Sequence, residues 1–246
     1  MGLEAVGTSS AGVAASLGVA DGEVLARDEM LAVVERIAHG VAIPVSADVE
    51  AGYGDTPDAV RETVALTVEA GAVGVNLEDG TDDPDQPLVP VADHCETVRA
   101  AREAAEAAHV PLVVNGRTDV FWRSVGDEHD RVDRAVERAN AYADAGSDCL
   151  FVPGVTDPDD VAALADGIDG PLNVLGGPGA PSTPELGELG VARVSVGSGP
   201  IRATLGHLRD VARELRDDGT YDRMDGAIPY SELNDLLAAS LARRSG

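Results

Sequence analysis

The 246-residue chain carries 44 acidic and 18 basic side chains, and its formal net charge of −26 makes nucleic acid and anionic membranes unfavourable partners. All the basic residues are arginine, and a chain without lysine cannot perform Schiff-base aldolase or lysine-anchored pyridoxal chemistry, or build a Walker-type phosphate loop. At this length the chain can form one large α/β barrel or two small domains.

Short β-prone segments alternate with alanine-rich helical segments along the whole chain. The β-prone segments are residues 4–8, 43–48, 73–78, 111–117, 149–153, 171–175 and 193–197. The clearest helical segments are residues 57–70, 92–108, 131–145 and 158–166. Repeated β-then-α units predict a parallel sheet covered by helices. No linker divides the sequence, so we expect residues 1–246 to form one domain, with residues 206–246 as its C-terminal helical region.

The number of β-prone segments favours an α/β fold of the TIM type, a (β/α)8 barrel whose first βα unit is missing from this sequence. A closed barrel of this type has eight strands, whereas the sequence offers seven. The first begins close to Met1, so either the sheet is open or the first βα unit is missing from this sequence, and we favour the second interpretation. Functional groups in such barrels lie at the carboxyl ends of the strands. These strand ends therefore predict the site.

The first strand ends in a run of hydroxyl-bearing and small residues, which includes Thr8, Ser9, Ser10 and Gly12. The backbone N–H groups of such a turn are suited to holding an anion. An ordinary polar loop has the same composition, and the residues alone leave both interpretations open.

The second and third strands end in carboxylates. Asp48 and Glu50 are two residues apart along a strand, so their side chains point to the same side, and Glu78 ends the next strand. Carboxylates side by side repel each other unless a proton or a cation lies between them. Three oxygen ligands without a histidine or cysteine beside them favour Mg²⁺ or Mn²⁺ over zinc. The alternative is that the Asp-x-Glu pair arises by chance in so acidic a chain.

Two later strands end in groups that suit a small anionic substrate. The fourth ends in Arg117, a natural partner for a substrate carboxylate, although an arginine here can also bridge two structural acids. The sixth carries Asn173, a further candidate for substrate binding. Glycine-rich turns follow the sixth and seventh strands, at the usual anion-binding position of such barrels.

The remaining titratable residues favour structural roles. Cys95 and Cys149 lack C-x-x-C spacing and are interpreted as buried thiols. The histidines fall mainly in helices or at helix ends, where structural roles are expected. His94, which comes directly after the long third loop, is the histidine placed best for a role in the site. Without a signal peptide or a long apolar stretch, we expect a soluble cytoplasmic protein. The excess of acidic residues further predicts a halophilic protein, because high salt screens the repulsion between their negative charges.

Five stretches of the sequence carry a resemblance to a known family. They are residues 7–10 with Asp21, residues 47–54 (Ala-Asp-Val-Glu-Ala-Gly-Tyr-Gly), residues 75–79, residues 116–119 and residues 190–195. In this order they resemble the motifs of the isocitrate lyase and phosphoenolpyruvate mutase superfamily. The resemblance implies a (β/α)8 barrel whose last helix is exchanged with a neighbouring subunit, usually within a homotetramer built as a dimer of dimers. It also implies that the first strand and helix of the family precede Met1.

The resemblance further implies a chemistry and roles for the residues. Superfamily members bind Mg²⁺ through water as well as carboxylates, and break or make a C–C or P–C bond next to the carboxylate of a 2-keto or 2-hydroxy acid. Asp48, Glu50 and Glu78 would hold the metal, and Arg117 would clamp the substrate. Ser9, Ser10 and Gly12 would bind the substrate carboxylate, with Asp21 at the metal or reacting face. Arg117, Asp21 and Asp48 are thus the expected catalytic residues.

One loop departs from the family pattern. Lyase members carry lysine and cysteine after the third carboxylate, whereas residues 81–93 contain neither. The chemistry that needs no such cysteine is stabilisation of a pyruvate-like enolate, as in decarboxylation or retro-aldol cleavage of a small diacid. Two alternatives stay open: P–C bond chemistry on phosphonopyruvate, and a non-catalytic protein that binds keto acids.

Overall fold

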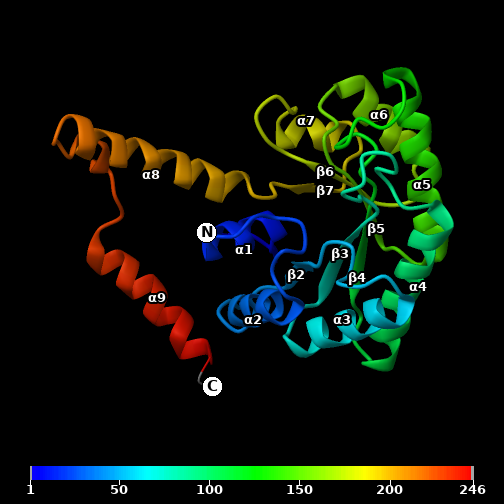
Figure 1. Ribbon diagram of the computed structural model, residues 1–246, viewed down its shortest axis with the longest axis horizontal. Helices are drawn as coiled ribbons and strands as arrows, with labels where there is room; N and C mark the ends of the chain where they lie inside the picture. Colours follow the sequence, from blue (N-terminus) through cyan, green and yellow to red (C-terminus); the bar gives the residue numbers. More distant parts are fainter. Residues whose placement is uncertain (1, 245–246) are drawn as a thin grey trace.

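Seven parallel strands form the wall of a nearly closed barrel in the computed structural model, which describes residues 2–244. The strands are β1 (Val6–Gly7), β2 (Val45–Asp48), β3 (Gly74–Glu78), β4 (Val113–Arg117), β5 (Cys149–Val152), β6 (Leu172–Leu175) and β7 (Arg193–Ser195). Each pairs with the next along the chain, so their carboxyl ends meet at one edge (Figure 1). Among the described residues no ladder joins β7 to β1. The predicted α/β barrel is confirmed.

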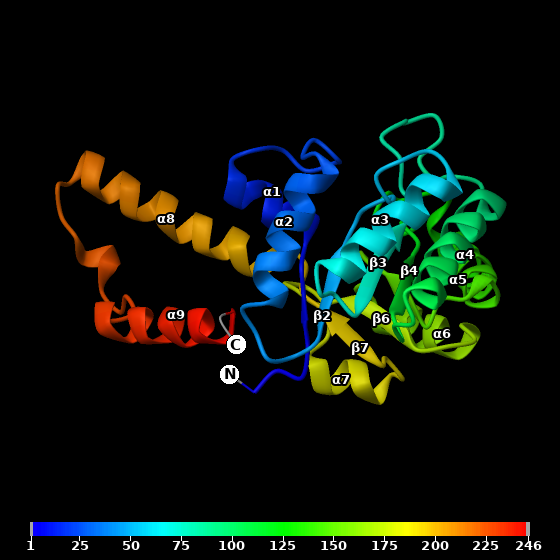
Figure 2. The same ribbon diagram turned by 90° about the horizontal axis from the view of Figure 1, so that it is seen from below.

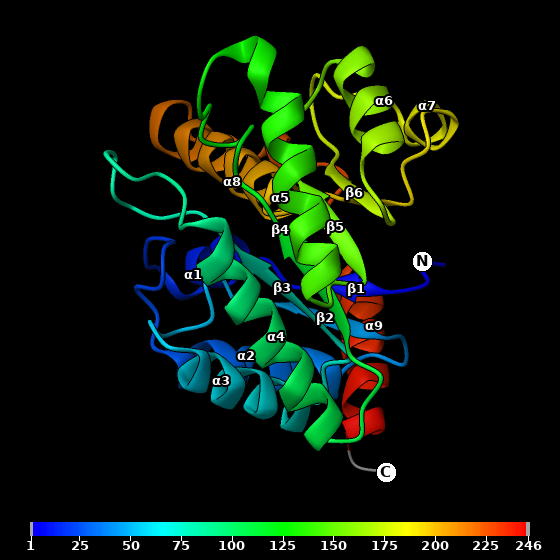
Figure 3. The same ribbon diagram turned by 90° about the vertical axis from the view of Figure 1, so that its right-hand side faces the viewer.

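Helices follow the strands, and most of them cover the outside of the barrel (Figure 3). They are α1 (Ser10–Leu17), α2 (Arg27–Ala38), α3 (Pro57–Glu69), α4 (Val91–Ala107), α5 (Arg131–Ala145), α6 (Pro158–Gly167), α7 (Thr183–Glu188), α8 (Gly199–Asp217) and α9 (Tyr230–Arg244), with short 3₁₀ turns η1 (Glu128–Asp130) and η2 (Asp222–Met224). The four helical segments that the sequence indicated most clearly correspond to α3, α4, α5 and α6. The expected order is therefore confirmed.

Local sequence explains where the helices begin and end. Thr56 and Asp157 accept hydrogen bonds from the first-turn amides of α3 and α6, and a proline follows each of them at the first helical position. Gly146 ends α5 with φ of 116°, a left-handed conformation that glycine adopts without steric cost. These signals fix the position of each helix relative to the strand that follows it.

The core lies between the sheet and the helices, and it is built mainly from valine, alanine and leucine. Its largest fully buried side chain is Tyr142 of α5. The Tyr142 ring lies against the imidazole of His94 on α4, with ring centroids 4.4 Å apart. His94 is therefore part of the core rather than of a metal site, and Cys95 and Cys149 are free and buried as expected.

The last two helices extend away from the barrel (Figures 1 and 2). Their exposed apolar side chains include Leu205, Leu208, Leu215, Leu233 and Leu236. Such a row of leucines on long helices is covered most naturally by another subunit. Exchange of the C-terminal helix within an oligomer thus stays a prediction. No described helix is long and apolar enough to cross a membrane.

Burial of His94 makes stability depend on pH. Burial, helped by the Arg138 charge and opposed by Asp79, lowers the pKa of His94 from its usual 6.5 to about 4. The folded protein therefore keeps this imidazole neutral, whereas the unfolded chain binds a proton below pH 6.5. Unfolding free energy should fall by roughly 3 kcal/mol between pH 6.5 and pH 4 on this account.

Urea unfolding at a series of pH values should show that His94→Gln loses this component of the pH dependence. His129→Gln is the matched control, because the His129 side chain is exposed and should leave the pH dependence as it is. Identical slopes in wild type and His94→Gln would contradict the account.

Candidate functional site

Asp48 lies at the end of β2 and is held on three sides. Its carboxylate accepts hydrogen bonds from the Ser10 amide at 2.9 Å and from Asn76 Nδ2 at 2.9 Å. Its own amide donates to Thr8 Oγ1 at 2.9 Å. The first loop thus contacts the second strand end directly, as the predicted site requires. Each Asp48 oxygen retains a further lone pair for a ligand.

Glu50 is buried in the turn that follows β2. Its backbone has φ of 53°, a conformation that non-glycine residues adopt only when their surroundings enforce it. The carboxylate accepts from the Glu23 amide at 2.7 Å and from the Tyr53 hydroxyl at 3.2 Å. Burial, with the charges of Asp21 and Asp48, raises its pKa to about 7. Asp21 is therefore near Glu50, and it is exposed, while its role at the reacting face stays a prediction.

Gly52 allows the chain to turn sharply after Asp48 and Glu50. Its φ is 107°, and a Cβ atom placed there would approach Val60 Cγ2 to 2.9 Å. A side chain at this position would clash with α3 and displace the turn. Glycine at position 52 is thus a requirement of the backbone.

Glu78 and Arg117 form an ion pair between adjacent strands. The two residues are register partners of β3 and β4, and Arg117 Nη1 lies 2.5 Å from Glu78 Oε2. Arg117 also donates to both oxygens of Asp119, at 2.6 and 3.1 Å. The guanidinium lies 5.8 Å from the ring centroid of Phe151. Arg117 therefore bridges two acids, and two of its five N–H groups are not used in these contacts.

Negative charge collects around this arginine. Burial raises the pKa of Glu78 to about 8, and the nearby Asp119, Asp48 and Glu50 add to the effect while Arg117 opposes it. Asp119 is fully buried, and the sequence indicated it only as the last residue of the stretch 116–119 that resembles the family. A second cation near these acids would relieve the repulsion.

Asp79 ends the stretch 75–79 that resembles the family, although the sequence predicted no role for it, and it supports the Arg117–Asp119 pair through the Asp119 backbone. Its carboxylate accepts from the Asp119 amide at 2.8 Å, from the Tyr142 hydroxyl at 2.6 Å and from Arg138 Nε at 2.7 Å. Arg138 also donates to the backbone carbonyl of Val89. Two of these partners, Tyr142 and Arg138, belong to α5, which is far from Asp79 in the sequence. No local sequence pattern predicts these contacts.

The remaining predicted residues make mainly structural contacts. Ser9 caps α1 and accepts from the Gly12 amide at 3.4 Å. Asn173 is fully buried, and its amide exchanges hydrogen bonds with Ser195 Oγ of β7 at 3.0 and 3.1 Å. The structure thus brings the first four strand ends together, while the hydrogen bonds of Asn173 join β6 to β7.

The predicted metal ligands suit an ion held partly through water. We use the name carboxylate cluster for Asp48, Glu50 and Glu78. These offer only oxygen donors, as Mg²⁺ prefers. Their ligand atoms do not all lie within 4.8 Å of one another, which is wider than direct coordination by all three requires.

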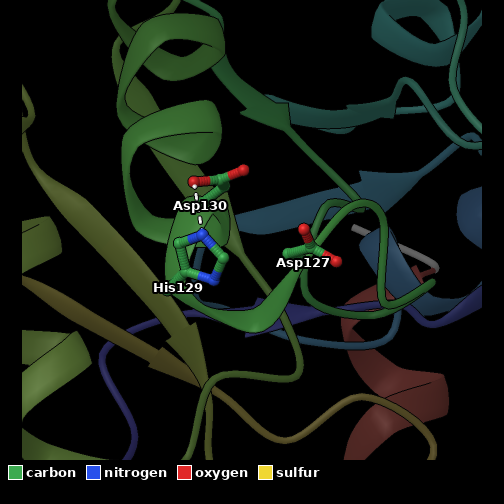
Figure 4. A group of neighbouring side chains, drawn as sticks. All are labelled: Asp127, His129 and Asp130. Atoms are coloured by element: carbon green, nitrogen blue, oxygen red, sulfur yellow. Dashed lines mark ion pairs between the residues drawn. The ribbon is translucent and has the colours of Figure 1, made fainter.

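A tighter group of possible ligands lies elsewhere on the surface. Asp127, His129 and Asp130 are close together around η1 (Figure 4), with His129 Nε2 3.3 Å from Asp130 Oδ1. Their ligand atoms all lie within 4.8 Å of one another, and no other three such side chains are as close together in the part of the chain that the structure describes. They are largely exposed and lack the buried surroundings of the carboxylate cluster.

Known proteins identify the family. The family model described as phosphoenolpyruvate phosphomutase matches residues 1–216. The chain belongs to the isocitrate lyase and phosphoenolpyruvate mutase superfamily. It is 32% identical to an oxaloacetate decarboxylase of Rhodopseudomonas palustris, over 94% of this chain and 75% of the relative. It is 29% identical to the 2-methylisocitrate lyase of Escherichia coli, over 89% and 75%. The family is enzymatic, as predicted.

A solved structure agrees with both the fold and the chemistry of the superfamily. Phosphonopyruvate hydrolase, determined in complex with oxalate and Mg²⁺, superimposes with a TM-score of 0.83 at 28% identity. The match covers 98% of this chain and 85% of that chain. This relative thus holds a divalent cation together with a small dicarboxylate.

The loop that departs from the superfamily's lyase pattern is anchored by Arg123. This residue donates to the Thr81 carbonyl and lies 3.3 Å from Asp119 Oδ2 and 3.9 Å from Asp82 Oδ1. A cavity of about 520 Å³ separates the loop from the segment after β4. It is lined by Asp82, Asp83, Pro84, Pro87, Arg123 and Ser124, among others. Arg123 thereby joins the loop to the acid that also holds Arg117.

Removal of this anchor should loosen the loop. In Arg123→Met, amide hydrogen exchange across residues 81–87 should accelerate about five- to tenfold, because the loop loses hydrogen bonds worth about 1 kcal/mol. Arg99→Met is the control, since Arg99 is half-exposed and forms an ion pair with Glu96 of its own helix, away from the loop. Unchanged exchange in Arg123→Met would show that the loop is held by other contacts.

Proposed function

We propose that this protein is a Mg²⁺-dependent lyase that cleaves a C–C bond next to the carboxylate of a small 2-keto or 2-hydroxy diacid. The bond would break through a pyruvate-enolate-like intermediate, as in oxaloacetate decarboxylation or methylisocitrate cleavage. The observation that carries the proposal is the carboxylate cluster beside a buried arginine at adjacent strand ends. The relatives named above act on substrates of this class.

The residues present fit a divalent cation. The carboxylate cluster offers oxygen donors, and its negative charge is compensated by Arg117 alone among the contacts described above. Mg²⁺ held there by Asp48, Glu50 and Glu78, partly through water, would supply the positive charge that stabilises a developing enolate oxygen.

The protein's own groups would bind and orient the substrate. The N–H groups of Arg117 that its acid partners do not use suit a substrate carboxylate. The loop of Thr8, Ser9, Ser10 and Gly12 opens α1, whose positive N-terminal end suits the same anion. Asp21, exposed next to Glu50, would lie at the reacting face.

Decarboxylation fits the loop of this chain best. Cleavage leaves the bonding electrons on the carbon next to the keto group, releases CO₂ and gives the enolate, which then takes up a proton to become the keto acid. Starting this reaction needs no acid–base cysteine, and residues 81–93 contain none.

A second candidate is P–C bond chemistry on a phosphonopyruvate-like substrate. It is supported by the family description and by the likeness to phosphonopyruvate hydrolase. ³¹P NMR of phosphonopyruvate incubated with the protein would distinguish this reaction, because the phosphorus resonance shifts when the P–C bond breaks.

The proposal predicts large losses from two substitutions. Asp48→Ala and Arg117→Ala should each lower the rate on the active diacid by roughly a hundredfold or more, because each removes a charge that acts on the transition state. The substrate is found by ¹H NMR of a panel of 2-keto and 2-hydroxy diacids with Mg²⁺ in molar salt.

Asp127→Ala is the matched control, since it removes an exposed carboxylate outside the site. Wild-type rates in both site variants would refute the proposal. Binding of the diacids without any turnover would favour a non-catalytic keto-acid-binding protein instead.

A further inference from the structure

Three polar side chains occupy one row across adjacent strands. Asp48 of β2 pairs in register with Asn76 of β3, and Asn76 pairs with Asn115 of β4. Register partners in a sheet project their side chains to the same face, so the three groups stand side by side. Asn76 is 9% exposed and Asn115 is 4% exposed, whereas most buried neighbours in the sheet are apolar.

The hydrogen bonds along this row run in a single direction. Asn115 Nδ2 donates to Asn76 Oδ1 at 2.8 Å, and Asn76 Nδ2 donates to Asp48 Oδ1 at 2.9 Å. A reversed Asn76 amide would set its oxygen against the Asp48 carboxylate and its NH₂ against that of Asn115. Asn115 therefore determines which group of Asn76 faces Asp48.

The far end of the row has a buried acceptor with no partner. Asn115 Oδ1 makes no hydrogen bond, and the next register partner is the thiol-bearing Cys149 of β5. An unsatisfied buried carbonyl destabilises the fold, and an apolar residue of the same size would avoid that cost. The donor of Asn115 is thus the part of the side chain that the site uses.

We propose that Asn115 and Asn76 form an amide relay that fixes the orientation of the Asp48 carboxylate and so raises the affinity of the carboxylate cluster for a divalent cation. The relay rests on the proposed function, because Asp48 is there a metal ligand. Asn76 holds Oδ1 from one side while the Ser10 amide holds Oδ2, so the remaining lone pairs keep a fixed direction. Asn115 is a positioning residue that touches no proposed ligand itself. Hydrogen-bonded supports of metal ligands commonly change metal affinity 10- to 100-fold.

The test is isothermal titration of Mg²⁺ into the intact protein, without substrate. Asn115→Leu keeps the approximate size and removes the donor, so its Mg²⁺ affinity should fall about 10- to 100-fold. Asn140→Leu is the matched control. Its side-chain amide on α5 makes two hydrogen bonds to backbone groups, to the Gly167 carbonyl at 3.0 Å and from the Asp169 amide at 2.8 Å, and neither involves Asp48. This control should bind Mg²⁺ as the wild type does.

The outcomes separate the relay from the proposed function. If wild type binds Mg²⁺ and Asn115→Leu binds it equally well, the relay is wrong while the proposed function stands. Equal losses in Asn115→Leu and Asn140→Leu would also overturn the relay, because they would reflect general destabilisation. If wild type binds no Mg²⁺, both fall. Should Asn115→Leu fail to fold, as judged by circular dichroism, Asn115→Ala replaces it with the same expectations.

Discussion

The crowding of buried negative charge around one arginine is the constraint on which the carboxyl edge of this barrel depends. Glu78 and Asp119 both contact Arg117, and Asp48 and Glu50 are close enough to raise the pKa of Glu78. Carboxylates so placed destabilise a fold unless hydrogen bonds and cations compensate them. The neighbouring loops, turns and helices can be understood as the means of that compensation.

Each acid is compensated by a different element. Asp48 uses the start of α1 and an asparagine of β3, while Glu50 uses the Glu23 amide and the Tyr53 hydroxyl. Asp79, one residue after Glu78, accepts hydrogen bonds from α5 and from the backbone amide of Asp119, just after β4. The site is therefore fixed by contacts between elements distant in the chain, and its rigidity comes from the barrel.

Much of this architecture follows from local sequence. The alternation of β-prone and helical segments, with caps such as Thr56 and Gly146, predicts the order of the strands and helices because each signal acts within one turn. The strand ends likewise predict Asp48, Glu50, Glu78 and Arg117, since parallel strands bring these ends to one edge.

Other features depend on register and tertiary packing, which local sequence does not encode. Asn76 and Asn115 form their hydrogen bond only when β3 and β4 pair in this register. Asp79 accepts from the Tyr142 hydroxyl only when α5 packs on the sheet. For Arg117 the sequence left two roles open, binding of a substrate carboxylate and bridging of two structural acids. Its contacts with two acids agree with the bridging interpretation, and its remaining N–H groups leave substrate binding available.

The central claim is that the carboxylate cluster and Arg117 form a cation-assisted site for an enolate. Oxalate resembles the enolate of pyruvate in shape and charge, and titration of oxalate in molar salt, with and without Mg²⁺, tests the claim directly. The account predicts tight binding that requires Mg²⁺. Failure to bind oxalate in the presence of Mg²⁺, or equal binding without it, would contradict the account.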